Sequence, residues 1–219
     1  MDDERDEPLD AAEMLALVER QQRDVQRRMG ALAPGILLAW GISWAVGFSC
    51  LWLIDGMRPA FGVPLWFAVI TFIVLQVTAL AVSAVLGIRM GRGIRSTPQS
   101  AFTGTTFGVT WPIGFVGIYG LGNALARGGM PLDLLNIYYP TASVLFVGVM
   151  YMLAGGIWHS KVSIGMGVWM IVLAAVAPQF GYPTHYLIFA IAGGGVFLIA
   201  ALVGFVVGRD PTGWGGWAR

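Results

Sequence analysis

Six long apolar stretches, separated by short polar connections, follow one another along most of the chain. No charged side chain lies inside any of them away from its ends. Because an α-helix rises about 1.5 Å per residue, about 20 residues cross the roughly 30 Å hydrocarbon core of a bilayer. The stretches match that length and predict six transmembrane helices, over residues 31–54, 63–89, 102–124, 140–158, 163–180 and 186–208.

The pattern is different before the first of these stretches. Asp10 and Glu13 have the spacing of a capping box, and apolar residues then recur at steps of three and four. This predicts an amphipathic helix over residues 10–29. Three alternatives are open for it: it rests on the bilayer surface, pairs in a short coiled coil, or docks a partner protein, and we favour the surface. Its apolar side chains suited to docking a partner include Leu15, Val18 and Val25.

The composition agrees with a protein whose surroundings are lipid. Hydrophobic residues make up 57% of the 219 residues, charged residues only 11%, and the mean hydropathy is +0.72. A soluble domain carries more charge. We therefore expect an all-α, polytopic helical membrane protein. Its parts are a cytoplasmic segment with an acidic start (1–30), a transmembrane domain (31–208) and a short cytoplasmic tail (209–219).

The distribution of basic residues predicts the orientation. If residues 1–30 lie in the cytoplasm, Arg58 and Arg127 are the only ones of the 13 basic residues on the opposite side. This is a strong positive-inside bias, and an even number of spans returns the carboxyl end to the same side. The acidic start is unlike a basic signal-peptide n-region, so no cleaved signal is expected. We expect a multi-pass protein of the inner (plasma) membrane with both termini in the cytoplasm.

Two of the predicted spans share an internal repeat. The first span contains GISWAVGF over residues 41–48, and the third contains GVTWPIGF over residues 108–115. A shorter likeness, Gly167-Val168-Trp169, occurs in the fifth span. Units of two spans keep the same orientation in the membrane, so the repeat indicates three tandem hairpins related by an axis along the membrane normal.

The repeat places Trp44 and Trp111 near the middle of the membrane, each beside a hydroxyl residue, Ser43 or Thr110. Tryptophan is more usual at the membrane interfaces. One interpretation is that the indoles line a central cavity for an amphipathic or apolar ligand, with the hydroxyls as hydrogen-bond partners. The other is close packing, in which glycines bring helices together and the indole fills the remaining space. We favour packing.

Other irregular positions also lie inside the spans. Gln76 is an amide near the middle of the second span, where an unpaired polar group is costly, so it either clasps a neighbouring helix or belongs to a polar path. The clasp is favoured. Pro112 removes a backbone hydrogen bond in the third span, which predicts a static bend, with a hinge as the alternative. The glycine-rich face of the sixth span serves either an intrachain contact or a homo-oligomer.

The sequence lacks the groups that catalysis or metal binding requires. No Asp, Glu, Lys, Arg or His lies at mid-depth, and the two histidines, His159 and His185, are at opposite edges of the membrane. No HExxH, GxSxG or phosphate-binding loop motif occurs, and the basic residues form no tract with exposed aromatics. We therefore expect no enzymatic activity, no catalytic or metal-binding residue, no cofactor and no nucleic-acid partner.

Several elements together carry a resemblance to known proteins. They are the acidic start, the sequence AEMLALVERQ over residues 12–21, Trp40-Gly41 and Gly155-Gly156-Ile157-Trp158. With these the chain resembles small six-span membrane proteins of high-GC bacteria, which are loosely labelled transporters. It is also similar to ABC-2 type exporter permeases in having a helix before six spans and a basic loop at residues 90–101. The short segment 181–185 departs from the longer outer segment of those permeases.

The resemblance implies a transport-related, permease-like integral membrane subunit whose energy comes from a separate protein. The implied partners are the lipid bilayer, a cytoplasmic ATPase or other membrane subunit, and a second copy through the sixth span. In this interpretation Arg92 and Arg95 join the amino-terminal helix as a docking surface. The cavity is lined by Trp44, Trp111, Gln76, Ser43 and Thr110. The alternative is a non-transporting scaffold or sensor that recruits partners through its cytoplasmic helix, which the lack of intramembrane charge favours slightly.

Overall fold

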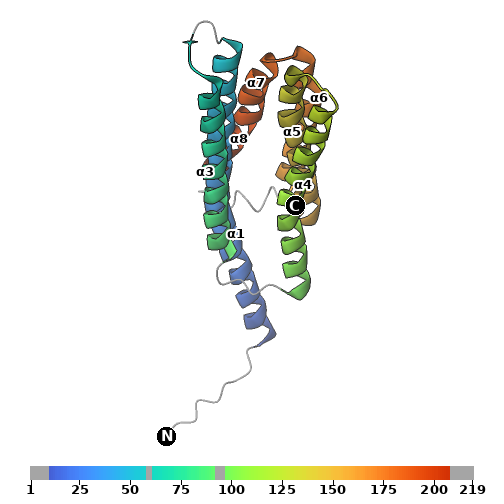
Figure 1. Ribbon diagram of the computed structural model, residues 1–219. Helices are drawn as coiled ribbons and strands as arrows, with labels where there is room; N and C mark the ends of the chain where they lie inside the picture. Colours follow the sequence, from blue (N-terminus) through green and yellow to red (C-terminus); the bar gives the residue numbers. More distant parts are fainter. Residues whose placement is uncertain (1–9, 58–60, 92–96, 208–219) are drawn as a thin grey trace.

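The computed structural model describes residues 10–57, 61–91 and 97–207, nearly all of them helical (Figure 1). The α-helices are α1 (Ala11–Leu51), α3 (Leu65–Gly91), α4 (Pro98–Arg127), α5 (Leu132–Ile157), α6 (Lys161–Val176), α7 (Thr184–Ile188) and α8 (Gly195–Val207). Two π-helical segments, η1 (Trp52–Gly56) and η3 (Phe189–Gly194), and one 3-10 segment, η2 (Ala177–Phe180), continue or connect them. These residues contain no strand, so the predicted all-α class is confirmed.

The predicted number of membrane spans is also confirmed. Six helical stretches are long and apolar enough to cross a membrane: Leu32–Gly56, Leu65–Gly91, Pro98–Arg127, Leu132–Ile157, Lys161–Phe180 and Thr184–Val206. The largest difference from the predicted boundaries is in the fourth span, which begins at Leu132 and not at residue 140. Leu134 and Leu135 continue its apolar length at this end, and Pro140 is accommodated inside the helix.

The first span and the amino-terminal helix are one continuous helix. α1 runs from Ala11 to Leu51 without a break, and its first turns extend beyond the rest of the bundle (Figure 1). The predicted helix over 10–29 is therefore present, but it is joined to the first span and is not a separate helix. Its position relative to the bilayer stays a prediction. The helix continues through this junction although Pro34 lies inside it and lacks a backbone N–H.

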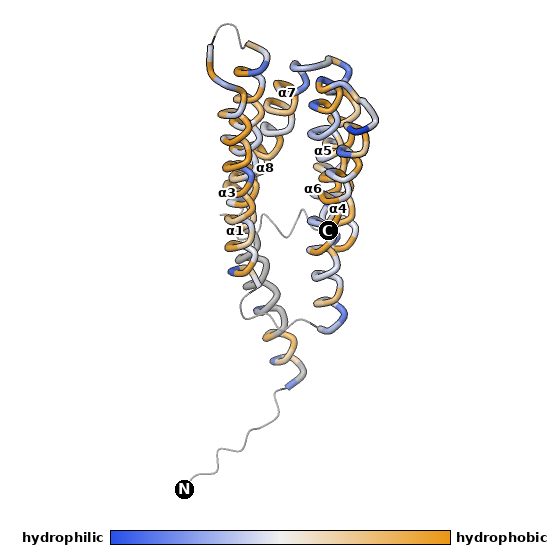
Figure 2. The backbone as a smooth tube through the Cα atoms, viewed as in Figure 1, coloured by the Kyte–Doolittle hydropathy of each residue, from blue (hydrophilic) through white to orange (hydrophobic). Residues whose placement is uncertain are grey.

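The spans pack as two groups of three. One group is α1, α3 and the last span, formed by α7, η3 and α8; the other is α4, α5 and α6 (Figures 1 and 2). α5 and α6 approach each other closely through glycines, since a Cβ atom on Gly167 would lie 2.7 Å from the carbonyl oxygen of Gly148. This pair cuts across the indicated hairpins, because the repeat assigns α5 and α6 to different ones. The pairs α1–α3 and α4–α5 keep to the indicated hairpins, whereas the α5–α6 pair joins two of them.

Hydrogen bonds and small residues hold α1 to its two neighbours. The Trp40 indole donates to the Ser83 hydroxyl of α3 at 2.9 Å, and the Ser43 hydroxyl donates to the Gln76 side-chain oxygen. On the α8 side, Gly194 lies so close to α1 that a Cβ atom on it would be 2.7 Å from the backbone nitrogen of Ala45. The glycine-rich face of the sixth span thus makes an intrachain contact, one of its two predicted roles.

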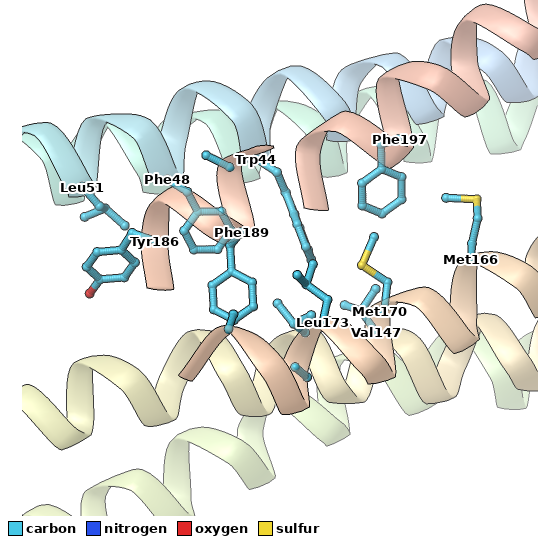
Figure 3. Packing of buried hydrophobic residues seen from close by; sticks show 14 of the residues in the cluster. Trp44, Phe48, Leu51, Val147, Met166, Met170, Leu173, Tyr186, Phe189 and Phe197 are labelled. Atoms are coloured by element: carbon cyan, nitrogen blue, oxygen red, sulfur yellow. The ribbon is translucent and has the colours of Figure 1, made fainter. Parts of the chain in front are cut away.

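An aromatic and methionine-rich core joins the two groups (Figure 3). Phe48 of α1, Phe189 of η3 and Phe197 of α8 face Met170 and Leu173 of α6 across this core. Phe189 and Met170 are completely buried. These large side chains pack against one another between the two groups of spans.

Candidate functional site

A shallow, open groove lies between the beginning of α4 and the end of α5. Its inner part has a volume of about 250 Å³. Its outer part has a volume of about 340 Å³. Thr103 and Ile157 line both parts, so the two form one continuous groove. We call it the α4–α5 groove. The other residues of the inner part are Phe102, Thr106, Phe107, Thr110, Met150 and Leu153, and those of the outer part are Thr97, Gln99, Ser100 and Trp158.

The spacing of residues on α4 explains why hydroxyl groups line one wall. Thr103, Thr106 and Thr110 recur at steps of three and four, which places them on one face of the helix. The Thr103 hydroxyl donates to the Gln99 carbonyl at 3.0 Å, and the Thr110 hydroxyl donates to the Thr106 carbonyl at 2.8 Å. Because their hydrogens are used within the helix, these two oxygens offer lone pairs to a ligand that carries a donor.

The character of the α4–α5 groove changes along its length. Its inner part lies among phenylalanine, methionine and leucine side chains, whereas its outer part is bordered by the hydroxyl and amide groups of Thr97, Gln99 and Ser100. Trp158 stands at the outer part, with its ring edge-to-face to Phe107 at 4.8 Å between ring centroids. A ligand that fits both parts is amphipathic, with a long apolar portion and a polar end.

The α4–α5 groove opens sideways. Phe102 is 74% exposed and Leu153 is 50% exposed, although both line its inner part. Both residues lie in helices that are long and apolar enough to cross a membrane. The exposed flank of the groove is therefore part of the apolar surface of two helices that could cross a membrane.

The predicted cavity residues are divided between the two groups of spans. Thr110 lines the α4–α5 groove. Trp111, the next residue, contacts the rings of Phe107, Phe115 and Phe146 at the α4–α5 contact. It is partly buried there and is not among the residues that line the groove.

The other three predicted residues, Ser43, Trp44 and Gln76, lie in the group that contains α1. Ser43 and Gln76 are bonded to each other across α1 and α3, which is the arrangement of the clasp. Trp44 is 4% exposed and packs edge-to-face on Phe48 and Phe197. Its indole N–H has no acceptor among the described residues.

The predicted hinge and the predicted docking residues lie away from the groove or outside the described side chains. Pro112 is exposed, and α4 continues as helix on both sides of it. Leu15 is exposed on the part of α1 that extends beyond the bundle. The side chains of Val18 and Val25 lie outside what the structure describes, as do Arg92 and Arg95.

A polar contact at the opposite end of the bundle was not predicted. Pro140 has no N–H, so the carbonyl of Asn136 loses its donor within α5. The Nε2 atom of His185 lies 3.1 Å from this carbonyl oxygen, and the Tyr186 hydroxyl lies 3.5 Å from it. Since a carbonyl only accepts, Nε2 carries the hydrogen. The contact ties α7 to α5. A proline four residues after a carbonyl is the sequence signal for such a missing donor.

The comparisons with known proteins add no relative. No protein-family model, no curated protein and no solved structure matches the chain.

Proposed function

We propose that this chain is a transport-related, permease-like subunit of a bacterial inner membrane that takes an amphipathic molecule from the bilayer into the α4–α5 groove. The observation that carries the proposal is the groove itself, which is apolar in its inner part, polar in its outer part and exposed along one apolar flank. Ligand sites combine mostly apolar walls with a few placed polar groups in this way.

The energy for transport would come from a separate cytoplasmic ATPase. The outer part of the groove lies at the end of the bundle where α4 and α6 begin and α5 ends. In the sequence, residues 89–97 and 158–161 include Arg89, Arg92, Arg95 and Lys161 and no acidic residue. The positive-inside rule then supports a cytoplasmic position for this end and for both termini. A cytoplasmic ATPase would meet the chain at the same end.

Affinity purification tests the dependence on a partner. The intact chain and a version that lacks residues 2–29 are isolated from native membranes in mild detergent, and stoichiometric partners are identified by mass spectrometry. We expect an ATPase that is retained by the intact chain and lost with the deletion. Recovery of the chain alone in both cases would contradict an energised subunit.

A flux assay tests the groove. Native membrane vesicles that contain the intact chain with its partners are loaded with a neutral fluorescent amphiphile and supplied with ATP, and the loss of the amphiphile is followed over time. Leu153→Trp fills the inner part of the groove and should reduce flux at least tenfold. Leu145→Trp is the matched control, because Leu145 is a similarly exposed leucine of α5 that does not line the groove. Equal flux from the two variants would remove the groove from the transport route.

A second function, that of a membrane scaffold or sensor, has one observation in its favour. Met14, Leu15 and Leu17 are each about half exposed on the part of α1 that extends beyond the bundle, at 52%, 62% and 47%. Apolar side chains on a helix outside the membrane suit a partner protein. The purification above separates the functions, since a scaffold would lose a regulator or enzyme, and not an ATPase, when residues 2–29 are removed.

A further inference from the structure

We infer that the α4–α5 groove holds an anionic phospholipid, with its headgroup at the outer part and an acyl chain along the inner part. The inference rests on the proposed function in taking the same groove as the site, and it adds the class of molecule.

The length of the groove fits one leaflet. Thr97 and Thr110 mark its two ends on α4, and the helix between them rises about 20 Å. One leaflet contributes about half of the roughly 30 Å hydrocarbon core, and the headgroup region adds several ångströms. An acyl chain with its headgroup therefore spans the groove from one end to the other, whereas a small polar solute would leave the inner part unfilled.

The lining changes in the same order as the parts of a phospholipid. Phe102, Phe107, Met150 and Leu153 present carbon surface to a chain in the inner part. At the outer part, the Thr97 oxygen accepts from the Ser100 backbone N–H at 3.2 Å, which leaves its hydroxyl hydrogen to donate. The side chains of Ser100 and Gln99 are exposed beside it and carry further donors. Phosphate oxygens accept such hydrogen bonds.

The charge of the surroundings favours an anionic headgroup. Residues 89–97 and 158–161, which include or adjoin the lining residues Thr97 and Trp158 along the chain, contain three arginines, one lysine and one histidine and no Asp or Glu. None of the residues that line either part of the groove is acidic. Basic residues beside a membrane surface attract anionic lipids, and they would do so for a lipid seated here.

The open flank supplies a route for the lipid. Because Phe102 and Leu153 are exposed toward the hydrocarbon, a phospholipid of this leaflet enters sideways with its headgroup still at the interface. A free phosphate in water has no such need of the inner part. We therefore assign the site to membrane phospholipid and treat soluble phosphate as a competing outcome.

Native mass spectrometry of the full chain tests the inference. The purified protein is mixed with equal amounts of phosphatidylglycerol and phosphatidylcholine in detergent, and retained lipid is counted. We expect phosphatidylglycerol to be retained at least fivefold over phosphatidylcholine. Leu153→Trp should lower this retention about tenfold, and Leu145→Trp should leave it unchanged. A double variant, Thr97→Val with Ser100→Ala, should weaken the retention of both lipids, because both carry a phosphate group. A second double variant, Arg89→Gln with Lys161→Gln, should keep a bound lipid but lower the preference for the anionic one. Circular dichroism and gel filtration confirm that each variant is folded.

Several results would overturn the inference. They are equal retention of the two lipids, retention that Leu153→Trp does not change, and displacement of the lipid by millimolar inorganic phosphate. These outcomes are independent of the flux assay with a neutral amphiphile. A chain that selects phosphatidylglycerol in the groove but shows no flux would refute transport and keep the lipid site, whereas flux that depends on Leu153 without lipid preference would do the reverse.

Discussion

The eight-residue repeat occurs twice, and the two copies meet different neighbours. In both, a glycine lets a phenylalanine of the following span approach closely: Gly47 contacts Phe72 of α3, and Gly114 contacts Phe146 of α5. The phenylalanine after each glycine adds a ring contact. The centroids of Phe48 and Phe72 are 4.9 Å apart. Those of Phe115 and Phe146 are 5.4 Å apart. The shared pattern thus encodes one local contact between neighbouring helices.

The two copies of the repeat differ in whether a third helix packs against them. In α1, Gly41 faces α8 so closely that a Cβ atom would lie 3.0 Å from the backbone nitrogen of Leu198, and Trp44 is buried beneath Phe197. In α4, a Cβ atom on Gly108 would meet nothing within 4 Å. A third helix therefore makes one copy part of the core and leaves the other at the periphery, next to the groove. The lesson is that a repeated motif specifies a pair of helices but not the environment of the pair.

The largest difference in stability between the two copies of the repeat is expected at their tryptophans. Trp44→Ala removes a nearly fully buried ring from the core and should lower the free energy of unfolding by about 3–5 kcal/mol. Trp111→Ala, at a partly buried position, should lower it by about 1–2 kcal/mol. Unfolding of the purified protein in mixed micelles, followed by circular dichroism, measures both. Equal losses would mean that α4 is as well covered as α1.

The glycines at the start of each copy give the next largest difference. Gly41→Val forces atoms against Leu198 of α8, and overpacking of this kind destabilises by about 1–3 kcal/mol. Gly108→Val enters open space and should change stability by less than about 0.5 kcal/mol. The same unfolding measurement applies. Destabilisation by Gly108→Val would indicate that another molecule covers this face of α4.

The hydroxyl residues of the two copies, Ser43 and Thr110, should differ less in their contribution to stability. Ser43→Ala removes the donor to Gln76 between α1 and α3, and interhelical bonds of this kind contribute about 0.6–1.7 kcal/mol in membranes. Thr110 donates only within its own helix, so Thr110→Val should be nearly neutral for stability. A double-mutant cycle with Gln76→Leu isolates the energy of the Ser43–Gln76 pair. A coupling energy near zero would exclude a clasp.

Hydropathy was sufficient to predict the spans because each helix must cross the same apolar thickness. It did not predict which helices are neighbours. Outward faces of spans such as α3 are as apolar as inward ones, as Val77 and Leu80 illustrate at 59% and 61% exposure, so the pattern does not mark the inner face. The break expected between residues 29 and 31 was also wrong, since the polarity changes there while the helix continues.

The groove was only partly predictable for a related reason. Thr110 was singled out because of the repeat, but Thr103 and Thr106 belong to no repeat and gave no signal. Their significance arises from Leu153 and Ile157, which lie about fifty residues later and reach them only through the packing of α5 on α4. A site formed by two distant segments at a helix contact requires knowledge of that contact. Trp44 and Trp111 were predicted to line a cavity for the same reason, which was a tryptophan near the middle of a span. Trp44 lies in the core of the structure.

A further difference between the two copies is the one position where the second copy has a proline. Ala45 of α1 contacts Gly194, whereas its counterpart Pro112 lies on the exposed side of α4 and deprives the Gly108 carbonyl of its helical donor. Pro112→Ala restores that hydrogen bond and should change the free energy of unfolding by less than about 1 kcal/mol. The flux of the neutral amphiphile distinguishes a static bend at Pro112 from a hinge, which a stability measurement does not. If the proline sets only a static bend, flux should stay within about twofold, and the flux variants of Leu153 should still show their full effect. If transport needs α4 to flex at this position, Pro112→Ala should lower flux in a chain that is as stable as before, while Ala45→Pro in α1 would simply unfold the core.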